Sequence, residues 1–211
     1  MVKAYIFDLD GTLLDSMPAA TKTILGYLDE HGVDYPSDII KTLAPLGYPG
    51  LSHYLVKEYS LGLTCEELYA HYMKRLAAVY ATEIPAKDGA EKTLRTLKAR
   101  GYRLNILTGS PHAFLDPAIK RLGWEDLFEN VWGVEDFSTN KSVVETFVEA
   151  AKRLKLSSAE CVMVDDSVHS LRFANQAGMK TIGCYDVFSA ENENEIRTFA
   201  DGYIKNFKEL L

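Results

Sequence analysis

Short apolar runs alternate with amphipathic segments from about residue 84 to residue 211, and this alternation constrains the fold more than any other feature of the sequence. Together with one run near the start of the chain, the apolar runs predict strands at 4–7, 103–107, 130–134, 161–164, 181–185 and 203–204. Apolar residues three and four positions apart predict helices between these strands, at 90–100, 114–122, 143–154 and 171–177. Strands joined through helices favour an α/β fold, a doubly wound parallel sheet with right-handed crossovers and helices on both faces.

A helical pattern interrupts this alternation directly after the first strand and continues for some 70 residues. We therefore expect two domains. The first is an α/β core domain of residues 1–15 and 84–211, and the second is a helical cap domain of residues 16–83. Because ligands of open α/β sheets bind beyond the C-terminal ends of the strands, an insertion at this point is placed to act as a lid.

The insertion carries recognisable start and stop signals for helices. Ser16 is the expected N-cap of its first helix, and Gly32 is the expected stop. Thr64 and Glu67 have the spacing of a capping box ahead of the last helix. A Gly- and Pro-rich stretch at 45–50 predicts a loop. On either side of this loop the expected helices are 38–43 and 51–59.

Two carboxylates directly follow the first strand. Asp8 and Asp10 are two residues apart, so in an extended segment both side chains point to the same side and address one reacting group. Gly11 then allows a sharp turn of the backbone. Carboxylates serve as nucleophiles or as general bases, although a strand that ends in a solvated acidic turn gives the same short pattern.

Two further strands end in polar residues that suit phosphate chemistry. The strand at 103–107 leads into Thr108 and Gly109, whose hydroxyl and backbone amides suit an anion. The strand at 161–164 leads into a second acidic pair, Asp165 and Asp166. Two acidic pairs at neighbouring strand ends repel each other unless a hard cation lies between them, so the sequence predicts an Mg²⁺ site.

Lys141 lies between the loop at 137–140 and the helix expected from 143, where its ammonium is within reach of the same edge of the sheet. There it would neutralise the charge of a phosphate and of the nucleophile. The alternative interpretation is a solvated lysine at the start of a helix.

The composition of this 211-residue chain excludes several classes of protein. With 47% hydrophobic and 25% charged residues the chain is expected to be globular, and its formal net charge of −7 argues against a nucleic-acid surface, which needs a basic face. Cys65, Cys161 and Cys184 have neither metal-ligand nor redox-pair spacing, as expected in a reducing compartment. Neither a signal segment nor a membrane-spanning run is expected, so we expect a cytoplasmic protein.

Taken together, these motifs resemble the haloacid dehalogenase superfamily, specifically its phosphatase and phosphomutase branch with a helical cap inserted after the first motif. The resemblance covers essentially the whole chain and is carried, in order, by residues 7–13, residues 107–110, Lys141 and residues 164–167. It implies a Rossmann-like core and a phosphoglycolate-phosphatase-like enzyme. The Pro-x-Pro turn that usually follows the lysine in this branch is absent here.

The resemblance implies a role for each carboxylate. Asp8 would attack phosphorus and form an aspartyl-phosphate, and Asp10 would give a proton to the leaving oxygen and later take one from water. Mg²⁺ would be bound by Asp8, by the carbonyl of Asp10 and by Asp166. Asp165 would support the metal site without binding the ion directly, as in family members that carry an acidic pair in the fourth motif.

The resemblance also implies which residues bind the substrate. Thr108, the Gly109 amide and Lys141 would hold the transferring phosphate oxygens. In the cap, residues 46–50 and His53 resemble the substrate-facing loop of phosphoglycolate-phosphatase-like members. The expected specificity residues are Gly47, Tyr48 and His53.

The expected function is the hydrolysis of a small phosphorylated metabolite, a phosphate monoester, by a monomer or dimer that binds neither nucleic acid nor membrane. A sugar-phosphate mutase similar to beta-phosphoglucomutase would use the same residues and remains an alternative. A haloacid dehalogenase needs no Mg²⁺, and Asp10 and Asp166 argue against it. A non-catalytic binding module would be favoured by the loss of Asp8, Asp10 or Asp166, and none is lost.

Overall fold

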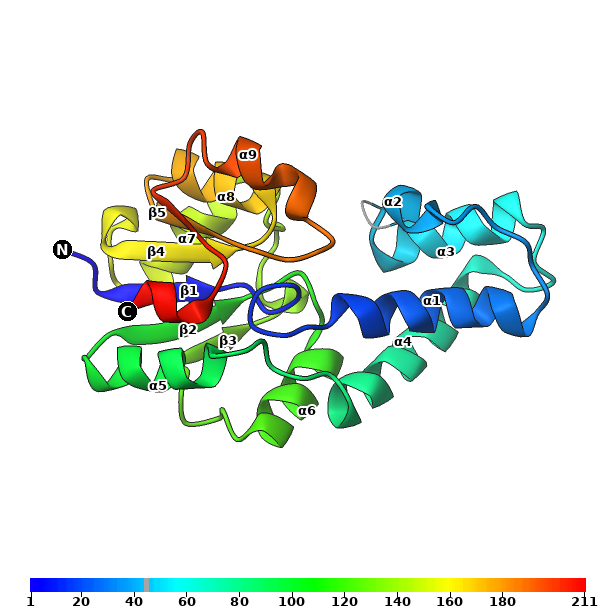
Figure 1. Cartoon of the computed structure of the whole chain (residues 1–211), viewed down its shortest axis with the longest axis horizontal. Coiled ribbons are helices and arrows are strands. Elements are labelled where there is room, and N and C mark those ends of the chain that lie inside the picture. Colours follow the sequence, from blue (N-terminus) through cyan, green and yellow to red (C-terminus); the bar gives the residue numbers. More distant parts are fainter. Residues whose placement is uncertain (44–45) are drawn as a thin grey trace. The chain divides into compact units, whose positions relative to one another are not determined.

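The structure is a computed structural model that describes residues 1–43 and 46–211 (Figure 1). The described chain divides into two compact units, a core unit of Met1–Ser16 with Ile84–Leu211 and an inserted unit of Met17–Glu83. Pro45, one of the expected loop residues, lies outside the described residues. No described helix is both long enough and apolar enough to cross a lipid bilayer.

The core unit is built on a parallel sheet. Its described strands number six and lie in the order β3-β2-β1-β4-β5-β6, each paired in parallel with its neighbour. The α/β fold expected from the alternation of strands and helices is therefore confirmed. The strands are β1 (Ala4–Phe7), β2 (Arg103–Leu107), β3 (Asn130–Trp132), β4 (Cys161–Asp165), β5 (Lys180–Cys184) and β6 (Gly202–Ile204).

Strand β1 lies between β2 and β4, where the order of the strands reverses direction. Phe7, its last residue, is in register with Ile106 of β2 and with Val164 of β4. The three central strands therefore end at the same level, and their C-terminal loops meet at one edge of the sheet. In open α/β sheets this switch point is where ligands bind.

Helices cover both faces of the sheet, because alternate strand residues point to opposite faces. Ala4 and Ile6 of β1 pack in one apolar cluster with Phe147 of α7 (Val144–Arg153) and Leu171 of α8 (Val168–Gln176). On the other face lies α5 (Ala90–Ala99), which is joined to the C-terminal turn by a hydrogen bond from Thr93 to the Phe207 carbonyl (Figure 1). The remaining core helices are α6 (His112–Leu122) and the short α9 (Glu193–Ile196).

Several core boundaries differ from those expected. Helix α8 begins three residues earlier than expected, because the hydroxyl of Ser167 caps it by accepting a hydrogen bond from the Ser170 amide. Helix α6 begins two residues earlier, directly after Pro111. Strand β3 ends at Trp132 rather than at residue 134, because Val134 begins a 3₁₀ turn.

The inserted unit consists of α1 (Met17–Glu30), α2 (Ile39–Leu43), α3 (Gly47–Glu58) and α4 (Cys65–Thr82) among its described residues. The expected capping box is present, since Thr64 and Glu67 bond reciprocally at the start of α4. Ser16 directly precedes α1, as expected of an N-cap, but its buried hydroxyl has no hydrogen-bond partner among the described residues, so its side chain does not cap the helix.

The expected loop at 45–50 is also wrong for residues 47–50, which form the first turn of α3. Pro49 lies in this turn, where its missing N–H is one of the donors that no helix can satisfy. Glycine and proline therefore do not prevent helix formation here.

Tyr72 joins α4 to α1, since its hydroxyl donates to the Ile24 carbonyl of α1 over 3.2 Å.

Candidate active site

The loop after β1 is a tight turn that places Asp8 inside the protein. The side chain of Asp8 is 6% exposed, and its amide donates to the Val164 carbonyl of β4. Both Leu13 and Leu14 donate their amides to the Leu9 carbonyl, at 2.9 and 2.8 Å, which closes the turn. Asp10 therefore lies on a loop whose backbone is held by hydrogen bonds between its own residues.

Gly11 is required in this turn for two reasons. Its φ of +73° is in the left-handed region that favours glycine. In addition, a Cβ atom at this position would lie 2.9 Å from Oδ2 of Asp166. The absence of a side chain lets the loop after β1 approach the acidic pair after β4.

Lys141 joins two of the buried carboxylates. Its ammonium donates to Oδ1 of Asp8 and, over 2.8 Å, to Oδ2 of Asp165. The side chain of Lys141 is 16% exposed and that of Asp165 is 1% exposed. The lysine expected at the edge of the sheet is thus not a solvated lysine at a helix start but lies against the expected nucleophile.

The two carboxylates of the acidic pair have different surroundings. Oδ2 of Asp165 accepts from Lys141 and, over 2.6 Å, from the Ser170 hydroxyl, while its Oδ1 accepts from the Ser167 amide over 2.8 Å. Asp166 is held only weakly by a side chain, through a 3.3 Å bond from the Thr12 hydroxyl. The oxygens of Asp165 are therefore occupied by protein donors, which leaves Asp166 better suited to bind a metal ion directly.

Asp10 is oriented by the loop after β2. The hydroxyl of Ser110 donates to Oδ2 of Asp10 over 2.6 Å, and the Ser110 amide donates to the hydroxyl of Thr108 over 3.2 Å. Thr108 is buried, and a Cβ atom at Gly109 would meet no described atom within 4 Å, so the space beside this glycine is open to a ligand. The loop therefore connects the expected phosphate-binding residues with the expected acid.

Two hydroxyls of this site, those of Thr12 and Ser170, were not predicted as functional, and Ser110 was expected only as part of the anion-binding turn after the strand at 103–107, not as a partner of Asp10. Thr12 and Ser110 lie inside the motifs at 7–13 and 107–110, and their closeness in sequence to Asp10 and Gly109 was the signal that could have identified these roles. Ser170 had a weaker signal, as the residue one helical turn after Ser167.

The site has an excess of buried negative charge. Burial raises the pKa of Asp8 well above its usual range, against the opposing effect of Lys141. Burial, reinforced by Asp165, raises the pKa of Asp166 to about 7. Burial alone would lower the pKa of Lys141, but Asp165 and Asp8 raise it overall. One ammonium does not balance these carboxylates, and a bound cation would.

The residues present fit a divalent cation. Carboxylate oxygens of Asp8, Asp165 and Asp166 all lie within 4.8 Å of one another. Because those of Asp165 already accept hydrogen bonds from the protein, Asp8 and Asp166 are the two that would bind the ion directly. A set of carboxylate oxygens is the donor set that hard cations such as Mg²⁺ prefer. The charge excess and the ligand chemistry therefore agree.

The expected specificity residues all belong to α3 of the inserted unit. Gly47 begins the helix with a φ of +63°, and the Tyr48 carbonyl accepts from the Ser52 hydroxyl over 2.8 Å. The ring of His53 contacts Sγ of Cys65 at 3.5 Å. Tyr48 and Gly47 line a mostly apolar cavity of about 190 Å³ within this unit.

A comparison with known proteins indicates the same type of chemistry as the residues of the site. The sequence profile of the haloacid dehalogenase-like hydrolases matches residues 2–178. A phosphoglycolate phosphatase of Colwellia psychrerythraea is 31% identical over 190 residues, which cover 84% of this chain and 82% of that protein. A glyceraldehyde 3-phosphate phosphatase of Pyrococcus furiosus is 29% identical and covers 100% of this chain and 92% of its own length.

The fold has close structural counterparts as well. CbbY from Rhodobacter sphaeroides, solved in complex with phosphate, superposes with a TM-score of 0.83 at 21% identity, over 100% of this chain and 96% of that one. At this identity the likeness concerns the fold alone. The matched profile, the sequence relatives and the site together lead to one conclusion. The chain belongs to the haloacid dehalogenase-like hydrolases, in the branch that contains the phosphoglycolate phosphatases.

Proposed function

We propose that the protein is an Mg²⁺-dependent phosphatase that hydrolyses a small phosphate monoester through an aspartyl-phosphate on Asp8. The observation that carries this proposal is the environment of Asp8, a buried carboxylate held by Lys141 at the switch point of the sheet. A nucleophile needs a fixed position and an unprotonated form, and a neighbouring ammonium supports both.

Asp10 is the proposed proton carrier. The Asp8 carboxylate attacks phosphorus, and Asp10 donates a proton to the departing oxygen of the ester. In the second half of the reaction Asp10 accepts a proton from the water that attacks the phosphoaspartate. The bond from the Ser110 hydroxyl to Oδ2 of Asp10 supports this role, because it fixes the orientation of the carboxyl group.

The proposed phosphate-binding groups are the Thr108 hydroxyl, the Gly109 amide and the Lys141 ammonium. Phosphoryl transfer depends mainly on positioning and on the stabilisation of charge, so donors fixed by a buried network contribute directly to the rate. Lys141 already contacts Asp8. If it also binds the phosphate oxygens, the same ammonium holds both the nucleophile and the phosphate.

Asp8, Asp166 and the carbonyl of Asp10 would hold the Mg²⁺ ion, and Asp165 would hold Lys141 in place beside them. When bound, the ion supplies positive charge against the oxygens of the transferring phosphoryl group. The saturated hydrogen bonding of Asp165 supports this division of roles.

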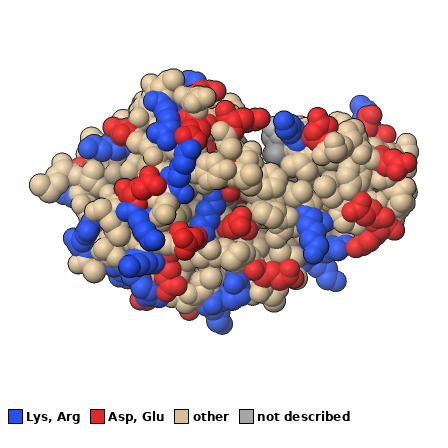
Figure 2. Space-filling model, viewed as in Figure 1, with Lys and Arg blue, Asp and Glu red and all other residues tan. Residues whose placement is uncertain are grey.

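The proposed substrate is a small phosphorylated metabolite, selected by the cap residues Gly47, Tyr48 and His53. The named relatives support this class, since one is a phosphoglycolate phosphatase and another a glyceraldehyde 3-phosphate phosphatase. Basic and acidic side chains are interspersed over the face seen in Figure 2, which suits a small ligand better than a nucleic acid.

We further propose a cytoplasmic monomer or dimer. The three cysteines are free thiols, as a reducing compartment requires. Gel filtration with light scattering would determine the oligomeric state.

The function is tested with a panel of phosphorylated metabolites and p-nitrophenyl phosphate in the presence of Mg²⁺, with phosphate release and sugar isomerisation measured in parallel. We expect phosphate release that is abolished by a chelator, by Asp8→Asn and by Asp166→Asn. Asp126→Asn, which replaces an exposed aspartate of the core unit, is the matched control and should retain activity. Isomerisation without release would favour a mutase, and full activity of Asp8→Asn would overturn the nucleophile.

A further inference from the structure

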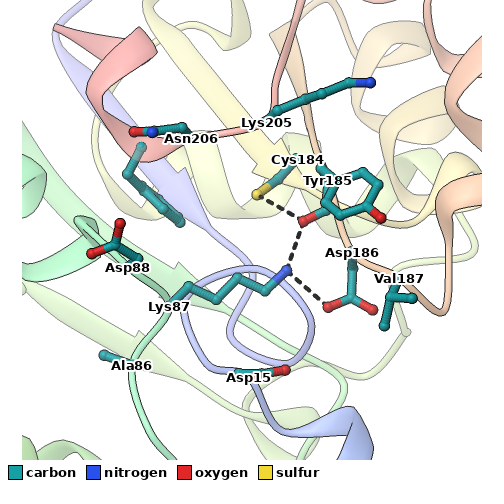
Figure 3. A pocket seen from close by; sticks show the side chains of 11 residues that line it. Asp15, Ala86, Lys87, Asp88, Cys184, Tyr185, Asp186, Val187, Lys205 and Asn206 are labelled. Atoms are coloured by element: carbon teal, nitrogen blue, oxygen red, sulfur yellow. Dashed lines mark hydrogen bonds and ion pairs between the residues drawn. The ribbon is translucent and has the colours of Figure 1, made fainter.

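Lys87 is a second nearly buried lysine of the core unit, and it lies outside the motifs of the site. It follows the return from the insertion and lines a cavity of about 350 Å³ together with Tyr185 and Asp186 (Figure 3). Its side chain is 15% exposed, and that of Asp186 is 2% exposed. A buried ion pair of this kind costs desolvation free energy, which offsets much of its contribution to stability.

The ammonium of Lys87 uses all three of its hydrogen atoms. It donates to the Tyr185 carbonyl over 2.7 Å, to Oδ2 of Asp186 over 2.8 Å and to the Gly11 carbonyl. The first two acceptors follow β5, and the third belongs to the loop after β1. Because β4 lies between β1 and β5, the lysine spans the strand end that carries the acidic pair.

The Gly11 carbonyl is one residue away from the proposed proton carrier. The peptide group that links Asp10 to Gly11 sets the direction in which the Asp10 side chain leaves the backbone, and the next peptide group carries the oxygen that Lys87 holds. The main chain of Lys87 contacts the same loop, since its amide donates to the Leu13 carbonyl over 2.9 Å.

Asp186, the carboxylate partner of Lys87, is itself held in place by hydrogen bonds. Oδ1 of Asp186 accepts from the Phe188 amide over 2.9 Å, and the Asp186 carbonyl accepts from the Ser189 amide over 3.2 Å. Asp186 therefore belongs to a turn that holds its carboxylate in one place, so that Lys87 has a rigid anchor.

We propose that Lys87, anchored by Asp186, is a positioning residue that holds the Gly11 carbonyl and thereby aligns Asp10 for proton transfer to the leaving group. The proposal rests on the proposed function, in which Asp10 is the proton carrier. Displacement of a catalytic group by about 1 Å lowers rates by about a hundredfold, so one lost hydrogen bond next to Asp10 has a measurable cost.

The readout separates positioning from stability. A p-nitrophenolate ion leaves without help from an acid, whereas an alkoxide requires a proton in the transition state. The ratio of kcat/KM for an alkyl phosphate to kcat/KM for p-nitrophenyl phosphate therefore reports proton delivery in the first half of the reaction. Partial unfolding lowers both values equally and leaves the ratio unchanged.

Lys87→Met leaves Asp186 buried without a partner and can impair folding, so the decisive protein is the double variant Lys87→Met/Asp186→Asn. It removes both charges of the pair together with the donor to Gly11. We expect the double variant to be folded and its alkyl-to-aryl ratio to fall about ten- to a hundredfold. The conservative variant Lys87→Arg should retain part of the wild-type ratio. Lys205→Met, which replaces an exposed lysine of the same cavity, should leave the ratio unchanged.

An unchanged ratio in the folded double variant would overturn the proposal, as would an equal loss with both substrates. Asp10→Asn, measured in the same way, separates this failure from a failure of the proposed function. If Asp10→Asn lowers the ratio and the double variant does not, Asp10 is the proton carrier and Lys87 does not position it. If Asp10→Asn leaves the ratio unchanged, the role of Asp10 itself is wrong.

Discussion

Replacement of Lys141 by methionine tests the electrostatic account of the site most severely. The ammonium is the cation that the structure places between Asp8 and Asp165, whose side chains are 6% and 1% exposed. Methionine keeps most of the length of the side chain and removes its charge. Lys141→Met therefore leaves two buried carboxylates without their shared partner.

The expected losses follow from this geometry. Removing one member of a buried ion pair costs about 3–5 kcal/mol of folding free energy, because the partner stays buried and uncompensated. Removing a donor that stabilises charge in the transition state lowers kcat by about 10²–10³. We expect losses of these sizes in the free energy of unfolding and in kcat for Lys141→Met.

In metal-free protein, the loss of unfolding free energy caused by Lys141→Met should depend on pH. Burial raises the pKa of Asp8 and Lys141 lowers it, so the pKa rises further in Lys141→Met. A carboxyl group whose folded-state pKa lies above its unfolded value favours folding below the unfolded pKa, and this contribution is lost as pH rises through the folded pKa. The variant should therefore lose more stability at about pH 8 than at about pH 5.

Urea unfolding at both pH values with a chelator, and kcat for p-nitrophenyl phosphate with Mg²⁺, measure the two effects. Lys3→Met is the matched control. Lys3 is 58% exposed and pairs with Glu160. It directly precedes β1 and therefore lies at the opposite end of this strand from Asp8. Lys3→Met should leave both quantities close to those of the wild type. A Lys141→Met protein with wild-type stability at the higher pH, or with the same loss at both pH values, would show that Lys141 does not compensate the buried charge of Asp8.

Two further predictions concern groups outside the carboxylate cluster. A hydrogen bond with Asp116 raises the pKa of His112 despite partial burial, so this pair stabilises the protein at low pH and ceases to do so as pH rises above the folded pKa. Asp116→Asn should lose about 0.5 kcal/mol of unfolding free energy in urea titrations at acidic pH and little at alkaline pH, and an equal loss at both would contradict this. Burial raises the pKa of Cys161 to about 11 and that of Cys184 to about 12, so iodoacetamide should label Cys65 first. Mass spectrometry of the native protein would contradict this if all three thiols were labelled at one rate.

The sheet could be predicted from the sequence because its strands alternate with helices, and each type of element has its own apolar period. The boundaries of helices were harder, since they depend on the first turn rather than on the period. Residues 47–50 show the reason. Gly47, Pro49 and Gly50 resemble a loop in composition, yet the first turn of a helix tolerates all of them.

The carboxylates of the candidate site could be found because strand ends in a parallel sheet share one edge. Asp8, Asp10 and the pair at 165–166 needed only that argument. Their hydrogen-bond partners could not be found in this way, because a hydroxyl such as that of Ser170 has many alternative uses in any chain. The contact between Lys87 and Gly11 depends on the path of the chain after the insertion, which no local pattern encodes.

The proposed reaction depends on a covalent intermediate on Asp8, and this intermediate can be trapped. Asp10→Asn keeps the nucleophile but lacks the base that activates water, so p-nitrophenyl phosphate should phosphorylate the enzyme faster than the phosphoenzyme is hydrolysed. With a radiolabelled phosphoryl group and an acid quench, we predict label on the peptide that contains Asp8. The same label should be missing from the Asp8→Asn/Asp10→Asn protein. Label on another residue, or turnover by the wild type with no label on Asp8 in the variant, would contradict the account.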